Sequence, residues 1–226
     1  MYPIHPCKWG MEARDFYKPE LQNTDSFYNH VKTKGRQLID MGPEHEDKKT
    51  IQAAIEHTRG FQNAVDVGCR DGLYTRYLMR HFHHCFAFDY RYHEYFAANV
   101  DTQSLRVTSF RCALGATTGQ IRASGRGDIR SKKINPNWSP LTGGKEINVY
   151  TLDQFCLEDV GLLKVDVDGM DEDVLRGSQH LIRSYKPVII VEQEQHSTHD
   201  AIAYLQREFD YKIKFQDKNK RNTVLA

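Results

Sequence analysis

The chain has 226 residues and a mass of 26.3 kDa, which allows one domain with a short extension and excludes a second full domain. Hydrophobic residues make up 39% of the sequence, which excludes global disorder because such a chain can bury a real core. With 31 basic and 30 acidic residues, the whole molecule has no net field that would attract nucleic acid or an anionic membrane.

Residues 1–47 are polar and broken by prolines, yet they contain several aromatic side chains. Such a segment cannot form a core alone, so we expect an arm or partial lid over the main domain, or a packed extension of it. The main domain then comprises residues 48–226. Its first predicted element is a helix that starts at Asp47 and has Gly60 at its C-cap position.

From residue 64 onward, predicted strands and helices alternate, which indicates parallel pairing with right-handed crossovers. The expected strands are residues 64–67, 85–89, 105–110, 162–167 and 187–193, and the expected helices are residues 73–82, 91–100, 171–185 and 197–209. Two last strands, 211–216 and 222–226, flank a turn and are expected to close the sheet as an antiparallel hairpin. The predicted fold class is therefore α/β, a three-layer, doubly wound, mostly parallel sheet.

A region between the third and fourth of these strands interrupts the alternation. Gly115 and Gly119 predict a hairpin, and residues 122–148 then read as a loop rich in Gly, Ser, Asn, Pro and basic residues. Residues 122–145 hold six basic residues against one acidic residue. Two interpretations stay open: a cover over the substrate that favours an anionic acceptor, or an ordinary solvated loop.

The cysteines and the N-terminal residues indicate the cellular compartment in which the protein is expected. The sequence has five cysteines, an odd number, and no C-x-x-C pair. We therefore expect reduced, mostly buried thiols. The N-terminal residues lack the basic and apolar regions of a signal peptide, and no window approaches 18 uncharged apolar residues. We therefore expect a soluble, cytoplasmic protein that does not span a membrane.

The first predicted strand ends in a glycine-containing turn, V-D-V-G-C-R-D-G, at residues 65–72. Ligands of open parallel sheets bind beyond the carboxyl ends of the strands, and two glycines four residues apart allow a tight turn with close backbone approach. Arg70 stands where a dinucleotide fingerprint needs its second glycine, which disfavours a pyrophosphate. Asp89 closes the second strand, where a carboxylate can accept hydrogen bonds from the two hydroxyls of a ribose.

A ribose-bearing cofactor without pyrophosphate suggests S-adenosylmethionine. The alternative is a plain strand–turn–helix connection with a solvated aspartate.

These residues resemble a known family. VDVGCRDGLYT is similar to the first motif of class I S-adenosylmethionine-dependent methyltransferases. The later segments SFRCALGATTGQIRA, VYTLDQF and LLKVDVDGMDEDVLRGSQHLIRSYKPVIIVE resemble the FkbM family, whose members read A-L-G-x-x-x-G, T-L-D-x-F, K-I-D-V-E-G with a following L-x-G, and P-V-I-x-x-E. The resemblance covers roughly residues 62–194 and implies a Rossmann-like, seven-stranded sheet whose last strand is antiparallel. Two departures are Asp168 in place of the glutamate and Cys69-Arg70-Asp71 in place of a small, Asn-containing turn.

The resemblance also implies roles for individual residues. Asp66 and the 68–72 turn would hold the methionine portion of S-adenosylmethionine, Asp89 would hold its ribose, and Asp166 would lie beside the sulfonium. Ala113 and Leu114 would flank the adenine. The cofactor-binding residues expected in full are Asp66, Gly68, Cys69, Arg70, Gly72, Asp89, Tyr90, Ala113, Leu114 and Asp166.

Methyl transfer to a hydroxyl requires that the partners be aligned and a proton removed. The candidate bases, in order of preference, are His196, Asp168 and Glu192, and His196 leads because its ordinary pKa suits neutral pH. A solvent-facing role for His196 is the alternative. Asp166, Asp168 and Glu192 could instead bind a divalent metal through oxygen, but we do not favour a metal site.

Three functions remain after this step. The leading hypothesis is an O-methyltransferase that acts on a hydroxyl of a small molecule or a saccharide, since the family resemblance implies such acceptors. The second is a nucleic-acid methyltransferase acting on a ribose hydroxyl, which the basic segment would serve. The third is a non-catalytic Rossmann-like binding module.

Overall fold

The computed structural model describes residues 46–90, 96, 100, 104–123, 145–167, 169–192, 200–219 and 221–226. The structural statements below refer to these residues. Outside them lie nearly all of the N-terminal arm, most of the predicted helix 91–100, most of the basic segment, and two predicted catalytic residues, Asp168 and His196.

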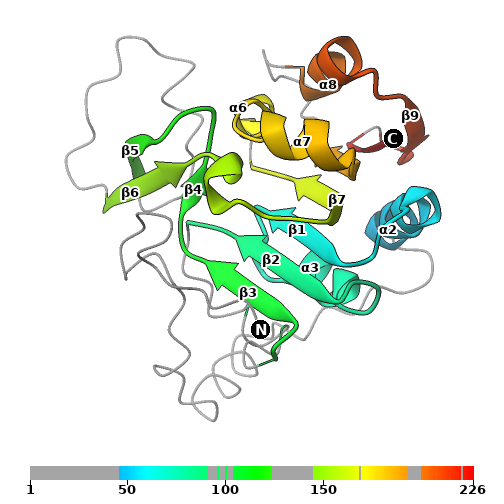
Figure 1. Cartoon of the computed structure of the whole chain (residues 1–226), viewed down its shortest axis with the longest axis horizontal. Coiled ribbons are helices and arrows are strands. Elements are labelled where there is room, and N and C mark those ends of the chain that lie inside the picture. The colour runs from blue at the N-terminus through cyan, green and yellow to red at the C-terminus, as the bar shows by residue number, and fades with distance from the viewer. Residues whose placement is uncertain are drawn as a thin grey trace.

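A seven-stranded sheet forms the centre of the fold (Figure 1). In spatial order its strands are β3 (Val107–Phe110), β2 (His84–Phe88), β1 (Asn63–Val67), β7 (Val160–Val165), β8 (Val188–Glu192), β10 (Asn222–Leu225) and β9 (Ile213–Gln216). β10 is antiparallel to both of its neighbours, and the other pairs are parallel. The predicted doubly wound, mostly parallel sheet with an antiparallel last strand is thus confirmed. The chain order reverses between β1 and β7, which makes their carboxyl ends the switch point.

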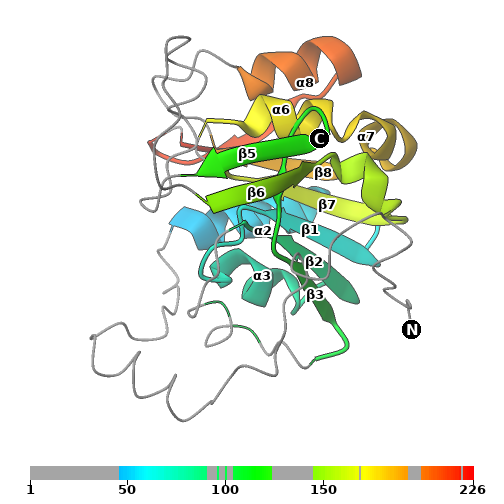
Figure 2. The same ribbon diagram turned by 90° about the vertical axis from the view of Figure 1, so that its left-hand side faces the viewer.

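Helices cover both faces of this sheet, as Figure 2 shows. α2 (Glu46–His57) and α3 (Leu73–Leu78) lie on one face, and α6 (Asp171–Arg176), α7 (Gln179–Tyr185) and α8 (Ala201–Phe209) lie on the other. Because side chains alternate along a strand, Val65 and Val67 of β1 pack in the core beneath α6, α7 and α8, whereas Ala64 packs in the core with α2 and α3. Every residue of β1 and β8 is buried, which explains why β8 begins with the continuous apolar run Val188–Val191.

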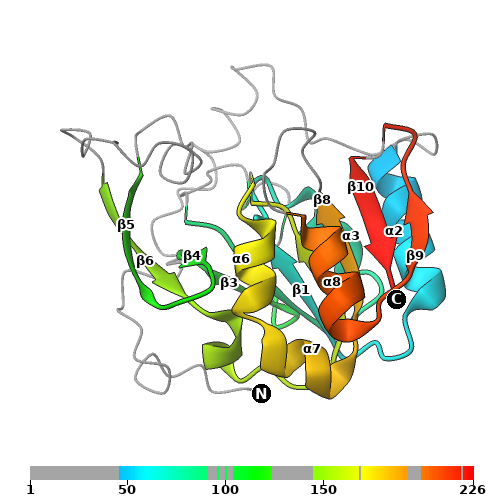
Figure 3. The ribbon, with the colours of Figure 1, turned by 90° about the horizontal axis from the view of Figure 1, so that it is seen from above.

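A second, three-stranded sheet lies beside the main one (Figure 3). It consists of β4 (Ala113–Leu114), β6 (Lys145–Tyr150) and β5 (Gly119–Ala123), with β6 in the middle, parallel to β4 and antiparallel to β5. The predicted hairpin through Gly115 and Gly119 is therefore wrong, because the strands on either side of it do not pair with each other. Residues 122–148 also are not one loop, since β5 extends to residue 123 and β6 begins at residue 145.

The predicted helix 171–185 is two helices, interrupted at Gly177 and Ser178. A Cβ atom at Gly177 would lie 2.1 Å from the carbonyl oxygen of Gly115, so this break lets the backbone of the α6–α7 connection touch the end of β4. A short 3₁₀ helix, η4 (Leu152–Phe155), follows β6 and contacts the same place, where the Asp153 N–H donates to the Gly177 carbonyl at 3.0 Å.

Helix ends differ from the prediction where local hydrogen bonding decides them. α3 ends at Leu78 rather than at residue 82, and α8 begins after Asp200, whose side chain accepts a hydrogen bond from the Ala203 N–H at 2.9 Å. No helix in the described part of the chain is long and apolar enough to cross a membrane. The four cysteines within it are free thiols, three of them buried and Cys156 exposed.

Candidate active site

The turn after β1 is shaped by two glycines in the left-handed region. Gly68 has φ +77°, and a Cβ atom there would lie 1.7 Å from the carbonyl oxygen of Asp166. Gly72 also has φ +77°, and a Cβ atom there would lie 2.5 Å from a Val100 methyl carbon. The first glycine therefore lets β1 and the end of β7 touch, and the second lets α3 start against the buried Phe96 and Val100.

Asp89 joins this turn to the end of β2. Its Oδ2 accepts a hydrogen bond from the Arg70 N–H at 3.0 Å, and its own N–H donates to the Phe110 carbonyl at 3.1 Å. Arg70 has φ +43°, the left-handed conformation that aims its N–H at Asp89. The predicted ribose-binding carboxylate is therefore fixed between the ends of β1, β2 and β3.

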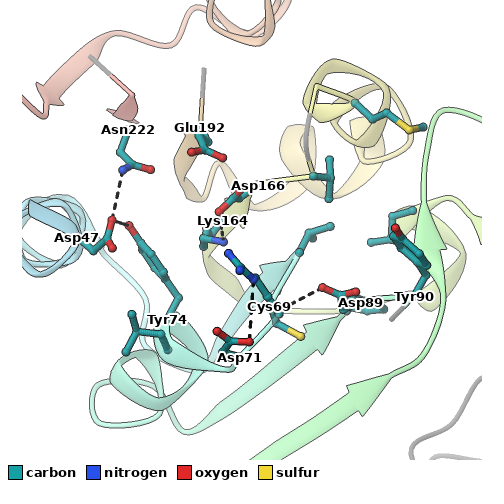
Figure 4. A pocket seen from close by; sticks show the side chains of 18 of the residues that line it. Asp47, Cys69, Asp71, Tyr74, Asp89, Tyr90, Lys164, Asp166, Glu192 and Asn222 are labelled. Atoms are coloured by element: carbon teal, nitrogen blue, oxygen red, sulfur yellow. Dashed lines mark hydrogen bonds and ion pairs between the residues drawn. The ribbon is translucent and has the colours of Figure 1, made fainter. Parts of the chain in front are cut away.

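A cavity of about 530 Å³ opens at the switch point of the sheet. Figure 4 shows Tyr90 and Asp89 on one side of it and Asp47, Tyr74 and Asn222 on the other, with Lys164, Asp166 and Cys69 between them. Much of the apolar lining lies at or near the ends of β1 to β4 and includes Val67, Phe88, Cys112, Ala113 and Leu114. The cavity thus runs from a largely apolar wall, past a carboxylate, to a strongly polar end.

Two acids and a lysine on adjacent strands form an ion-paired group beneath the cavity. Asp66 of β1 is opposite Lys164 of β7, and their side chains lie 3.4 Å apart, Oδ1 to Nζ. The Lys164 ammonium also lies 3.2 Å from Asp166 Oδ2. Asp66 is fully buried and accepts a 2.6 Å hydrogen bond from Thr75 Oγ1. Burial acts to lower the pKa of Lys164, but the two carboxylates outweigh it and raise that pKa well above its ordinary value.

Asp166 and Glu192 form a coupled pair of carboxyl groups at the polar end. Burial acts to raise the pKa of Asp166, but the Lys164 ammonium and hydrogen bonds from Glu192 and Lys164 lower it below its ordinary value. Burial, with the hydrogen bond to Asp166 and its charge, raises the pKa of Glu192 to about 8, against the opposing effect of Arg221. Of the two carboxyl groups, Glu192 is therefore the one that takes up a proton more readily.

The β9–β10 turn presents Arg221 to this pair. The Arg221 guanidinium forms an ion pair with Glu192 while its side chain stays 68% exposed. Asp217 shapes the turn by accepting hydrogen bonds from the N–H groups of Arg221 and Asn222, at 2.8 and 3.0 Å. Asp47 connects α2 to the same polar end of the cavity. Its Oδ1 accepts hydrogen bonds from the Tyr74 hydroxyl at 3.0 Å and from the Asn222 amide at 3.3 Å.

Most of the cofactor-binding residues expected from the sequence lie in this cavity wall. Those that line the cavity are Gly68, Cys69, Arg70, Asp89, Tyr90, Ala113, Leu114 and Asp166, together with the candidate base Glu192. Asp66 and Gly72 are not in the lining: Asp66 lies behind it and holds Lys164, and Gly72 begins α3. Asp168 and His196 are outside the described residues.

Within the described part of the chain, no three His, Cys, Asp or Glu side chains are grouped so that they could hold a metal ion. Asp168, one of the three ligands considered above, is not in that part.

Sequence reasoning missed several residues of the polar end. Lys164 had a usable signal, since a lysine within the apolar run LLKVDV interrupts an otherwise buried strand. Asp47, Tyr74, Arg221 and Asn222 carried no such signal, because Asp47 and Asn222 are 175 positions apart in the chain and meet only through the tertiary fold.

Such a cavity can hold a molecule that combines an aromatic ring, a diol and a charged end. Beside the charged end it places two carboxyl groups, one with a lowered pKa and one with a raised pKa. Comparisons with known proteins agree with the geometry. The family model described as the methyltransferase FkbM domain matches residues 18–213. No curated protein matches the sequence.

Among solved structures, the FkbM methyltransferase from Methylobacillus flagellatus KT is 16% identical with a TM-score of 0.52, and the match covers 90% of this chain and 58% of that one. The chain therefore spans less than two thirds of that protein. An rRNA methylase from Streptococcus thermophilus is 12% identical with a TM-score of 0.47, and the match covers 83% of this chain and 96% of that one. At 16% identity, the likeness to the Methylobacillus flagellatus KT protein speaks to the fold alone. Because the family model matches most of its length, the chain belongs to the FkbM methyltransferase family.

Proposed function

We propose that the protein is an S-adenosylmethionine-dependent methyltransferase that transfers a methyl group to a hydroxyl oxygen of a small molecule or a saccharide. The observation that carries this proposal is the cavity at the switch point of the sheet, in which the Asp89 carboxylate stands between an apolar wall and a charged end. Membership of the FkbM family supports it.

The residues present fit this cofactor in chemistry and in order. Cys112, Ala113 and Leu114 would flank the adenine. Asp89 would accept hydrogen bonds from the ribose hydroxyls. The Gly68–Arg70 turn and Asp166 would adjoin the methionine portion, where an anionic side chain is favourable to a sulfonium.

When bound, S-adenosylmethionine supplies an activated methyl group, and the chain's residues have three tasks: alignment, exclusion of water and removal of the acceptor proton. His196, Asp168 and Glu192 are the proposed bases, in the order given above. Glu192 can remove a proton only when its own carboxyl is ionised. With a pKa of about 8, the ionised fraction of Glu192 becomes large only as the pH rises above neutrality.

Isothermal titration with S-adenosylmethionine and S-adenosylhomocysteine tests the cofactor assignment. Wild-type protein should bind both, and Asp89→Ala should weaken both about ten- to a hundredfold, because hydrogen bonds to a charged group are worth about 1.5–3 kcal/mol each. Glu208→Ala, which removes a carboxylate of α8 outside the cavity lining, is the matched control and should leave affinity unchanged. If neither compound binds, both methyltransferase hypotheses are contradicted, and a binding module with another ligand is favoured.

The acceptor is tested separately, with the methyl-labelled cofactor and panels of saccharides, small alcohols and RNA. Transfer to saccharide or alcohol hydroxyls supports the proposal. Transfer to RNA, with binding that weakens steeply as salt is raised, would replace it with the nucleic-acid alternative.

A further inference from the structure

A buried lysine within a parallel strand calls for a physical reason. Lys164 is 2% exposed and interrupts the apolar run of β7, between Leu163 and Val165, both fully buried. Buried ion pairs pay a large desolvation cost, and apolar replacements of such pairs are often neutral or stabilising. Stability of the sheet alone therefore does not account for Lys164, and a role in the neighbouring cavity does.

The contacts of Lys164 fix it from three sides. Asp66 lies 3.4 Å away on β1, Asp166 lies 3.2 Å away just after the end of β7, and the Tyr74 ring centroid of α3 lies 4.7 Å away. Asp66 is itself held by the Thr75 hydroxyl. The ammonium is thus anchored from behind and cannot follow Asp166 if that side chain rotates.

Of the two carboxylates that pair with Lys164, Asp166 lines the cavity and Asp66 does not. Its side chain is 32% exposed, against 3% for Lys164 and 0% for Asp66. Its backbone is fixed as well, because its N–H donates to the Val67 carbonyl at 3.0 Å and its own carbonyl lies against Gly68. An anchored cation therefore holds a partly exposed carboxylate at the cavity surface.

We propose that Lys164 is a positioning residue, which through its ion pair holds Asp166 ionised and oriented at the place where the sulfonium of the cofactor would lie. This inference rests on the proposed function for the identity of the cation that Asp166 faces. The charged and titratable groups that surround the Lys164–Asp166 pair are Asp47 of α2, Asp66 of β1, Cys69 of the glycine turn, Tyr74 of α3, Asp171 of α6, Glu192 of β8 and Arg221 of the β9–β10 turn.

Discrimination between S-adenosylmethionine, which carries the sulfonium, and S-adenosylhomocysteine, which lacks it, is the readout. In Lys164→Met, Asp166 loses its cation, so its pKa rises and it becomes protonated at acidic pH. Selectivity is the ratio of the affinity for S-adenosylmethionine to the affinity for S-adenosylhomocysteine. In the variant this ratio should be about tenfold lower than in the wild type at pH 5.5 and within about threefold of it at pH 8. Lys164→Arg should retain the wild-type selectivity at both pH values, and so should the exposed-lysine control Lys212→Met.

A merely structural role predicts a different result: both compounds would lose affinity equally and at both pH values, which would overturn the proposal. A second measurement needs neither the variant nor a ligand. The carboxyl carbon of Asp166, followed by NMR in the wild-type protein, should titrate below the ordinary aspartate range, and a midpoint at or above that range would also overturn it. Because this titration uses ligand-free protein, it separates failure of the Lys164 assignment from failure of the proposed function.

Discussion

At the scale of single residues, Gly68 explains why the turn after β1 cannot vary freely. It combines a left-handed backbone with direct contact to the Asp166 carbonyl, so the same residue shapes the turn and sets the distance between β1 and β7. The close approach brings the Gly68–Arg70 backbone next to Asp166 at the cavity wall.

Gly68→Ala should destabilise the fold by about 3 kcal/mol or more, because it adds left-handed strain to a backbone clash that no side-chain rotation relieves. Urea denaturation measures the change. Gly60→Ala is the control, since nothing lies within 4 Å of the Cβ it would add and its φ is not in the left-handed region. Equal midpoints for the two variants would contradict this account of the turn.

The part of the site that follows from local sequence was predictable. Gly68 and Asp89 are identified by their spacing at the ends of successive strands, since parallel strands bring their carboxyl ends to one edge. Asp66 was placed on the correct strand, but the alternation of side chains and the pairing with Lys164 put it behind the cavity. Asp47, Arg221 and Asn222 could not be found this way, because they join the site only after the sheet has brought α2 and the β9–β10 turn together.

At the scale of elements, the T-L-D-Q-F segment that resembles the family motif has a structural role. Asp153 of η4 caps α7, because its two carboxylate oxygens accept hydrogen bonds from the N–H groups of His180 and Leu181, both at 2.9 Å. The Gly177 carbonyl accepts from the Asp153 N–H, and Gly177 also touches Gly115. Three separated motifs thus meet at one point behind the cavity.

Asp153→Ala should cost about 1–2 kcal/mol of unfolding free energy, since two N–H groups at the start of α7 lose their acceptor. Chemical denaturation followed by circular dichroism gives the value. Glu158→Ala, at an exposed position three residues beyond η4, should cost much less. If the two variants are equally stable, Asp153 does not cap α7 in solution.

Element types were easier to predict than element partners. The alternation of apolar and amphipathic segments correctly predicted the main-sheet strands and the helices α2, α3 and α8. It failed for β6, because this strand begins with two charged residues, Lys145 and Glu146, which resemble the polar segment before them more than a strand. It also ran α6 and α7 together, because the break at Gly177 is imposed by contact with Gly115 rather than by local preference.

At the scale of the whole molecule, two buried acids make stability depend on pH. Burial, with the charge of Asp166, raises the pKa of Asp171 to about 7, and the pKa of Glu192 is raised to about 8. The folded state therefore keeps protons that the unfolded chain releases near pH 4. Stability from these groups is present at pH 4–5 and is lost as the pH rises toward 8. The lowered pKa of Asp166 affects the pH dependence of stability only at pH values below this range.

Between pH 5 and 8 the unfolding free energy of the wild-type protein should fall by about 2 kcal/mol more than that of Asp171→Asn. The substitution keeps an oxygen that can accept the Val167 N–H, a bond of 3.2 Å in the structure. Urea denaturation at several pH values gives the slope. Glu158→Gln should retain the wild-type slope, and an Asp171→Asn slope as steep as the wild type would show that Asp171 does not hold its proton.

The small sheet has a consequence for how this chain tolerates change. Ala123 and Lys145 are paired neighbours on β5 and β6, so these two chain positions are held at one place in the small sheet. Extra chain length between two positions that are held together costs little, about 0.6 kcal/mol for each doubling of that length. Residues inserted between Ala123 and Lys145 should therefore leave the register of the seven-stranded sheet intact.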